Sequence, residues 1–165
     1  MRKILEEQLS DLHEDFAQMG REVAQAIENA TKVFQSHDKE LANKVGENDN
    51  RINESEIYLE RKTAQVIALQ QPVASDLRVL ITILKASSDL ERIGDHAVSV
   101  AHAAMRIGDQ RRNKEIEDTL VGLANMFIRC WWRLSKLMLI IMKKMHARLL
   151  NWTPKVMNIY VMLED

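Results

Sequence analysis

The chain has 165 residues, enough to bury the core of one domain or of two small helical repeats. Hydrophobic residues make up 46% and charged residues 28%, a balance typical of soluble globular proteins. A single cysteine excludes an internal disulfide framework, and the longest apolar stretch, residues 137–142, is far shorter than the roughly 20 residues of a membrane span. The N-terminus lacks the apolar core of a signal peptide, so we expect a cytoplasmic protein.

The net charge of −1 hides an asymmetry between the two ends of the chain. Residues 1–118 carry −6, whereas residues 119–165 carry +5. A basic segment can indicate nucleic-acid or anionic-lipid binding. Here the seven Lys and Arg side chains are scattered along the segment and form no cluster, so we expect no nucleic-acid binding.

Apolar residues at three- and four-residue steps predict two long helices in the first 70 residues. The first stripe consists of Leu5, Leu9, Leu12, Phe16, Val23, Ile27, Ala30 and Phe34. The second consists of Leu41, Val45, Ile52, Leu59, Val66 and Leu69. Asp38 stands between them, and its side chain is expected to cap the second helix.

A third helix is predicted from Pro72 to Ile107, with the proline in its first turn and Gly108 as the C-terminal cap. Three long helices joined by short turns predict an all-α fold, an antiparallel three-helix bundle over residues 1–108. A polar connector follows, and a further helical pattern starts at Ile116. Residues 109–165 have room for a fourth helix and part of a fifth, so they are expected to form an incomplete second repeat.

The third helix contains the best candidate for a functional site, the segment Glu91-Arg92-Ile93-Gly94-Asp95. Residues four apart lie on one helical face, so Glu91 and Asp95 are neighbours beside an apolar stripe. Two carboxylates in that setting are unfavourable unless a cation neutralises them, and hard cations prefer oxygen ligands. An alternative interpretation of equal weight is that they belong to a solvated, ion-paired surface.

The second helix offers a matching polar stripe at four- and three-residue steps. It consists of Asp49, Asn53, Glu56 and Glu60. If this stripe faces Glu91 and Asp95, a carboxylate-rich site results. A solvated helix face with ordinary i,i+4 pairing explains the same pattern, and spacing alone favours that explanation.

No feature of the chain indicates catalysis. It has no Gly-rich phosphate loop, no Gly-x-Ser-x-Gly elbow and no His-Glu-x-x-His motif. No His stands three residues after a Glu, which disfavours a di-iron bundle. His96 and His102 are expected to be ordinary surface residues, and Cys130 is expected to lie in the core beside Trp131.

Two segments of the third helix closely resemble the PhoU family in sequence, order and separation. They are residues 69–78, Leu-Gln-Gln-Pro-Val-Ala-Ser-Asp-Leu-Arg, and residues 89–97, Asp-Leu-Glu-Arg-Ile-Gly-Asp-His-Ala. Met19-Gly20 and the segment Asp38-x-Glu40-Leu41-Ala42 are similar as well. The resemblance implies two three-helix repeats, of which the second is truncated here.

The resemblance also implies a function and a site. PhoU proteins repress the phosphate-starvation response by contacting a phosphate-specific ABC transporter and a sensor histidine kinase, so they reach the membrane only through partners. Their Glu/Asp-x-x-x-Asp motifs bind a divalent or trivalent metal ion, iron or zinc being the leading candidates. On this chain the ligands would be Glu91, Asp95, Asp49 and Asn53, where asparagine replaces a common acid and weakens that half of the site.

Arg78 and Arg92 also match family positions, where they could contact a partner or pair with a neighbouring helix. The truncated second repeat leaves one bundle face without its usual cover, so a homodimer is expected. Two alternatives remain open: a generic metal-binding helical scaffold, and a metal-dependent enzyme that uses the carboxylates.

Overall fold

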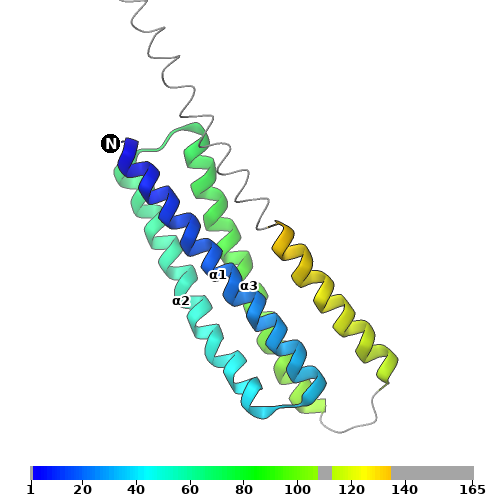
Figure 1. Ribbon diagram of the computed structural model, residues 1–165. Coiled ribbons are helices and arrows are strands. Elements are labelled where there is room, and N and C mark those ends of the chain that lie inside the picture. Colours follow the sequence, from blue (N-terminus) through cyan, green and yellow to red (C-terminus); the bar gives the residue numbers. More distant parts are fainter. Residues whose placement is uncertain (1, 108–112, 135–165) are drawn as a thin grey trace, which may run out of the picture.

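The computed structural model describes residues 2–107 and 113–134, and every element in these ranges is a helix. Three helices form the bundle: α1 (Arg2–Ser36), α2 (Lys39–Gln70) and α3 (Ala74–Ile107). They run antiparallel in sequence order, side by side along their whole length (Figure 1). The prediction of an all-α three-helix bundle is therefore confirmed.

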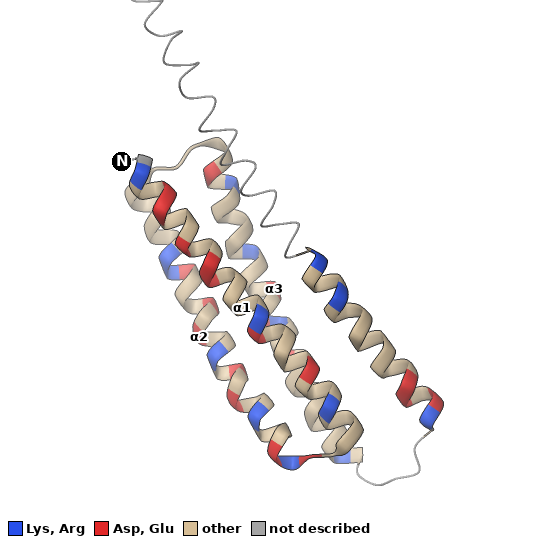
Figure 2. Ribbon diagram, in the orientation of Figure 1, with Lys and Arg blue, Asp and Glu red and all other residues tan. Residues whose placement is uncertain are grey.

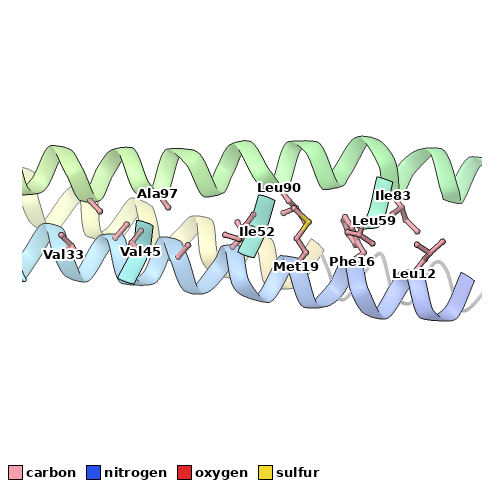
Figure 3. Close-up of a cluster of buried hydrophobic side chains, with 14 of the residues drawn as sticks. Leu12, Phe16, Met19, Val33, Val45, Ile52, Leu59, Ile83, Leu90 and Ala97 are labelled. Carbon is pink, nitrogen blue, oxygen red and sulfur yellow. The ribbon is translucent and has the colours of Figure 1, made fainter. Parts of the chain in front are cut away.

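The core is a continuous column of apolar side chains along the bundle axis (Figure 3). The stripe predicted for α1 faces this column, and Leu12 and Val23 are almost completely buried. Met19, which the predicted stripe omitted, is also fully buried, because it fills the helical position between Phe16 and Val23.

The core face of α2 repeats every seven residues. Val45, Ile52, Leu59 and Val66 are all buried at this period. Leu69 was predicted to belong to the same face, but its side chain is 63% exposed. The prediction was wrong because, at the last turn of α2, the rest of the described chain leaves this side chain largely uncovered.

The turns explain the helix boundaries. The Asp38 carboxylate accepts a hydrogen bond of 3.0 Å from the Leu41 amide, so the predicted N-cap is confirmed. At the other end of α2, Gln71 adopts the left-handed conformation with φ 48°, and its amide donates to the Ile67 carbonyl. Pro72 was predicted in the first turn of the third helix, but α3 begins at Ala74. The prediction was wrong because residues 71–73 are needed to reverse the chain direction.

Ion pairs between α1 and α2 lie on the outside of the bundle. The Lys62 ammonium lies 2.8 Å from the Asp15 carboxylate, and the Arg51 guanidinium lies 3.4 Å from Glu22. Such partly exposed pairs contribute up to about 1 kcal/mol each, so the apolar column provides most of the stability.

Residues 114–134 form a further helix that lies beside the bundle (Figure 1). We call this helix the strap. The indole N–H of Trp131 donates a 3.2 Å hydrogen bond to the Gly20 carbonyl of α1. Cys130 is exposed, so the prediction of a core cysteine was wrong: Trp131 takes the position that faces the bundle.

Part of the predicted second repeat lies outside the described residues. The strap corresponds to the first part of the predicted fourth helix, whereas Gly108 and residues 135–165 belong to the undescribed ranges. The division into repeats at residues 108 and 109 therefore stays a prediction. Among the described helices, none is both long enough and apolar enough to cross a membrane.

Candidate functional site

Helices α2 and α3 lie close together at Gly94, a buried residue of α3. A β-carbon at this position would lie 3.2 Å from the Ile52 Cδ1 atom and 3.4 Å from the Asp49 Oδ1 atom. The absence of a side chain therefore allows α2 to lie close to α3. This close approach places the Asp49 carboxylate against the Glu91-to-Asp95 turn of α3.

Four carboxylates influence one another's charge across this interface, and we call them the acidic cluster: Asp49, Glu56, Glu91 and Asp95. Burial raises the pKa of Glu91, and the charges of Asp95, Glu56 and Asp49 raise it further, in that order. Burial and the charge of Asp95 likewise raise the pKa of Asp49. Asp49 and Glu56 of the α2 stripe thus lie on the side of α2 that faces Glu91 and Asp95 of α3.

Two oxygens in the site have no hydrogen-bond donor. Asp49 Oδ1 and Asn53 Oδ1 are both buried, and neither has a hydrogen-bond partner. Buried acceptors without donors are rare, because each retains its desolvation penalty of about 1–3 kcal/mol. A bound cation would satisfy these oxygens and neutralise the cluster, and carboxylate and amide oxygens suit hard or borderline cations.

The side chains are not preassembled around a metal position. Within residues 2–107 and 113–134, no three His, Cys, Asp or Glu side chains converge as a group that could hold a metal ion. Asp95 is exposed, whereas Glu91, Asp49 and Asn53 are partly buried. The site therefore offers suitable oxygens, but its carboxylates would have to change rotamer to surround an ion.

The other predicted residues lie around the cluster. Arg92 is exposed, and its positive charge offsets a small part of the rise in the pKa of Glu91. Arg78 is exposed near the start of α3. Glu60 lies one turn beyond Glu56 and is exposed. It is not among the groups that raise the pKa of Glu91 or of Asp49. His96 is exposed and turns toward the strap instead of the cluster.

Sequence reasoning missed the role of Gly94. Gly94 was considered only as part of the segment from Glu91 to Asp95. A glycine inside an otherwise regular helix is itself evidence that another helix packs closely there. Glycine lowers helix stability by about 1 kcal/mol relative to alanine, so its presence in a helix interior points to a close packing contact.

Comparison with known proteins decides the family. A family model described as PhoU domain matches residues 16–104, more than half of the chain. This chain belongs to the PhoU family. The matched range contains all four predicted ligands and the Gly94 contact between α2 and α3.

Similar proteins are named as homologues of PhoU, the accessory protein of the phosphate-specific transport system. The chain is 34% identical over 118 residues to a protein of Clostridium acetobutylicum, an alignment covering 71% of the chain and 54% of that relative. It is 35% identical over 111 residues to one of Streptococcus pneumoniae serotype 4, covering 67% and 51%. A protein of Aquifex aeolicus is 37% identical over 103 residues, covering 62% and 47%. The chain spans about half the length of the curated relatives it matches.

Proposed function

We propose that this chain regulates phosphate uptake and represses the phosphate-starvation response when phosphate is abundant. The observation that carries this proposal is the PhoU-domain match over residues 16–104, which coincides with the three-helix bundle. The relatives' association with the phosphate-specific transport system supports the same role.

The chain acts through protein contacts and carries out no catalysis. Its partners are the phosphate-specific ABC transporter and a sensor histidine kinase, which it meets on the cytoplasmic side of the membrane. A bundle with exposed charged faces suits such contacts, and Arg78 and Arg92 are candidates for them because both are exposed. The protein forms a homodimer, which light scattering at micromolar concentration tests; a clean monomer contradicts it.

The acidic cluster binds a metal ion, iron or zinc, through Glu91, Asp95, Asp49 and Asn53. The buried oxygens of Asp49 and Asn53, which lack donors, and the raised pKa values of Asp49 and Glu91 support this assignment. A metal ion supplies positive charge that links carboxylates on two helices. The chain's own residues would then hold α2 against α3 and fix the surface that a partner contacts.

The deciding experiment is complementation of a bacterial strain that lacks its own PhoU, with alkaline phosphatase measured in phosphate-rich medium. Repression by this chain is expected, and it should be lost in the double variant Glu91→Ala, Asp95→Ala. The matched control is Glu60→Ala, Asp89→Ala, which likewise removes one Glu and one Asp, from exposed positions on α2 and α3. High phosphatase despite good expression of the parent chain would refute the function.

Measuring the metal content of the purified protein distinguishes a metal-binding regulator from a helical scaffold whose acidic residues bind no metal. The purified parent chain and the control variant are expected to contain metal, and the Glu91→Ala, Asp95→Ala variant is expected to contain none. Equal metal in all three proteins would show that the site is elsewhere. Complementation without any bound metal would leave the regulatory role intact and refute only the metal assignment.

A further inference from the structure

An apolar trough of about 640 Å³ lies between α1, α3 and the strap. Sixteen residues of the described part of the chain line it, and of these sixteen only Thr31 and His96 have polar side chains. The Thr31 hydroxyl already donates to the Ile27 carbonyl at 2.8 Å. A polar occupant would therefore find almost no hydrogen-bond partners in the trough, and water gains little there.

The strap lines one side of the trough with five apolar residues: Leu120, Val121, Leu123, Ala124 and Phe127. Leu120, Ala124, Phe127 and Trp131 follow one another at steps of four, three and four, so they share one helical face. Leu120 and Phe127 are 46% and 43% exposed. Between residues 119 and 128 the strap carries no charged side chain, and its charges lie at the two ends (Figure 2).

The two ends of this stripe differ in their contact with the bundle. Trp131 packs against the hydrophobic core and bonds to the Gly20 carbonyl. A β-carbon at Gly20 would lie only 2.6 Å from the Trp131 ring, so the glycine is what permits this contact. Toward Leu120 the same stripe faces the open trough and the exposed apolar side chains Val100 and Ile107 of α3.

We propose that the strap is a closing element, which swings about the Gly20–Trp131 contact and fills the trough with its own apolar stripe. The trough adjoins the contact that Trp131 of the strap already makes with Gly20 of α1. Closure therefore extends this contact between the strap and the bundle. No charged side chain of the strap has to leave water when it closes, because residues 119–128 are uncharged. The bundle thus has an open form with an accessible apolar trough and a closed form without it.

Distance measurements between spin labels test this directly in the full chain. Labels are placed at His102→Cys on α3 and Asn125→Cys on the strap, in a Cys130→Ser background. Both positions are exposed, and neither lines the trough. Two distances are expected, the shorter one from the closed form. A single distance at the value of the open form would overturn the proposal.

The pivot has a matched pair of variants. Gly20→Val puts a branched side chain where even one β-carbon meets the Trp131 ring, so the short distance is expected to disappear. Gly46→Val makes the same change in α2, where nothing lies within 4 Å of an added β-carbon, and both distances should remain. Trp131→Phe provides a milder test of the pivot if Gly20→Val does not fold. A short distance that persists in Gly20→Val and in Trp131→Phe would refute this pivot.

A second copy of the chain is the competing occupant of the trough. Adding a tenfold excess of unlabelled protein leaves distances within one chain unchanged and dilutes distances between chains. The short distance is expected to persist at full amplitude. Its loss on dilution would assign the trough to a partner protomer and overturn closure by the strap.

Discussion

Replacing Gly94 with alanine tests the close approach of α2 and α3 that builds the acidic cluster. In a helix interior, glycine to alanine ordinarily stabilises a protein by about 0.5–1 kcal/mol. At Gly94 the new methyl group would lie 3.2 Å from Ile52 Cδ1, inside the optimal carbon–carbon separation of about 3.5–4.0 Å. Ile52 is completely buried, so it can move only by displacing other core side chains.

Overpacking of this kind costs about 1–3 kcal/mol, which exceeds the gain in helix propensity. We therefore expect Gly94→Ala to lower the free energy of unfolding by an amount between zero and about 2.5 kcal/mol. Gly94→Val, which adds two more methyl groups, should be clearly more destabilising. The matched control is Gly46→Ala in α2, where an added β-carbon meets nothing within 4 Å. It should gain the full value of about 0.5–1 kcal/mol.

Urea unfolding followed by circular dichroism measures all three variants against the parent chain. A 1 kcal/mol difference corresponds to about 2–4 °C in the melting temperature for a protein of this size. The reasoning is refuted if Gly94→Ala stabilises the protein as much as Gly46→Ala does. That result would mean that α2 and α3 are farther apart than the structure places them, and that the acidic cluster is looser as well.

Three further predictions concern single side chains. Thr63 is completely buried, and its hydroxyl has no hydrogen-bond partner. Thr63→Val should therefore raise the free energy of unfolding, measured by urea unfolding, by about 1 kcal/mol. A loss of stability would show that the hydroxyl does have a hydrogen-bond partner. The raised pKa of Glu91 means that the folded protein binds more protons than the unfolded chain above the ordinary value of 4.5. Stability should therefore fall as the pH rises from about 4.5 through the raised pKa in metal-free buffer, and Glu91→Gln, but not the exposed Glu60→Gln, should reduce that fall. Lys62→Met breaks the 2.8 Å pair with Asp15 and should cost at most about 1 kcal/mol, with the loss shrinking in 1 M salt; a loss of 3 kcal/mol would mean that the pair is effectively buried.

The sequence by itself determined the helices and the faces they bury. The stripe of α1, the seven-residue repeat of α2 and the Asp38 cap are local patterns, and each follows from helix geometry and backbone hydrogen bonding alone. The candidate residues Glu91 and Asp49 were also found from spacing and from family resemblance. In these cases the information lies within one helix and the residues beside it.

Only the tertiary structure decided how the helices are placed relative to one another. Hydrophobic periodicity shows which face of a helix is buried, but it does not fix how far two helices are shifted along their axes. It therefore could not predict which residues of α2 lie opposite Glu91. The contact between Gly94 and Ile52 determines which residues of α2 and α3 lie opposite each other. The contact between Gly20 and Trp131, 111 residues further along the chain, places the strap against α1 in the same way. Leu69 and Cys130 were misassigned for the same reason: whether an apolar side chain is buried depends on a neighbour that lies far away in the sequence.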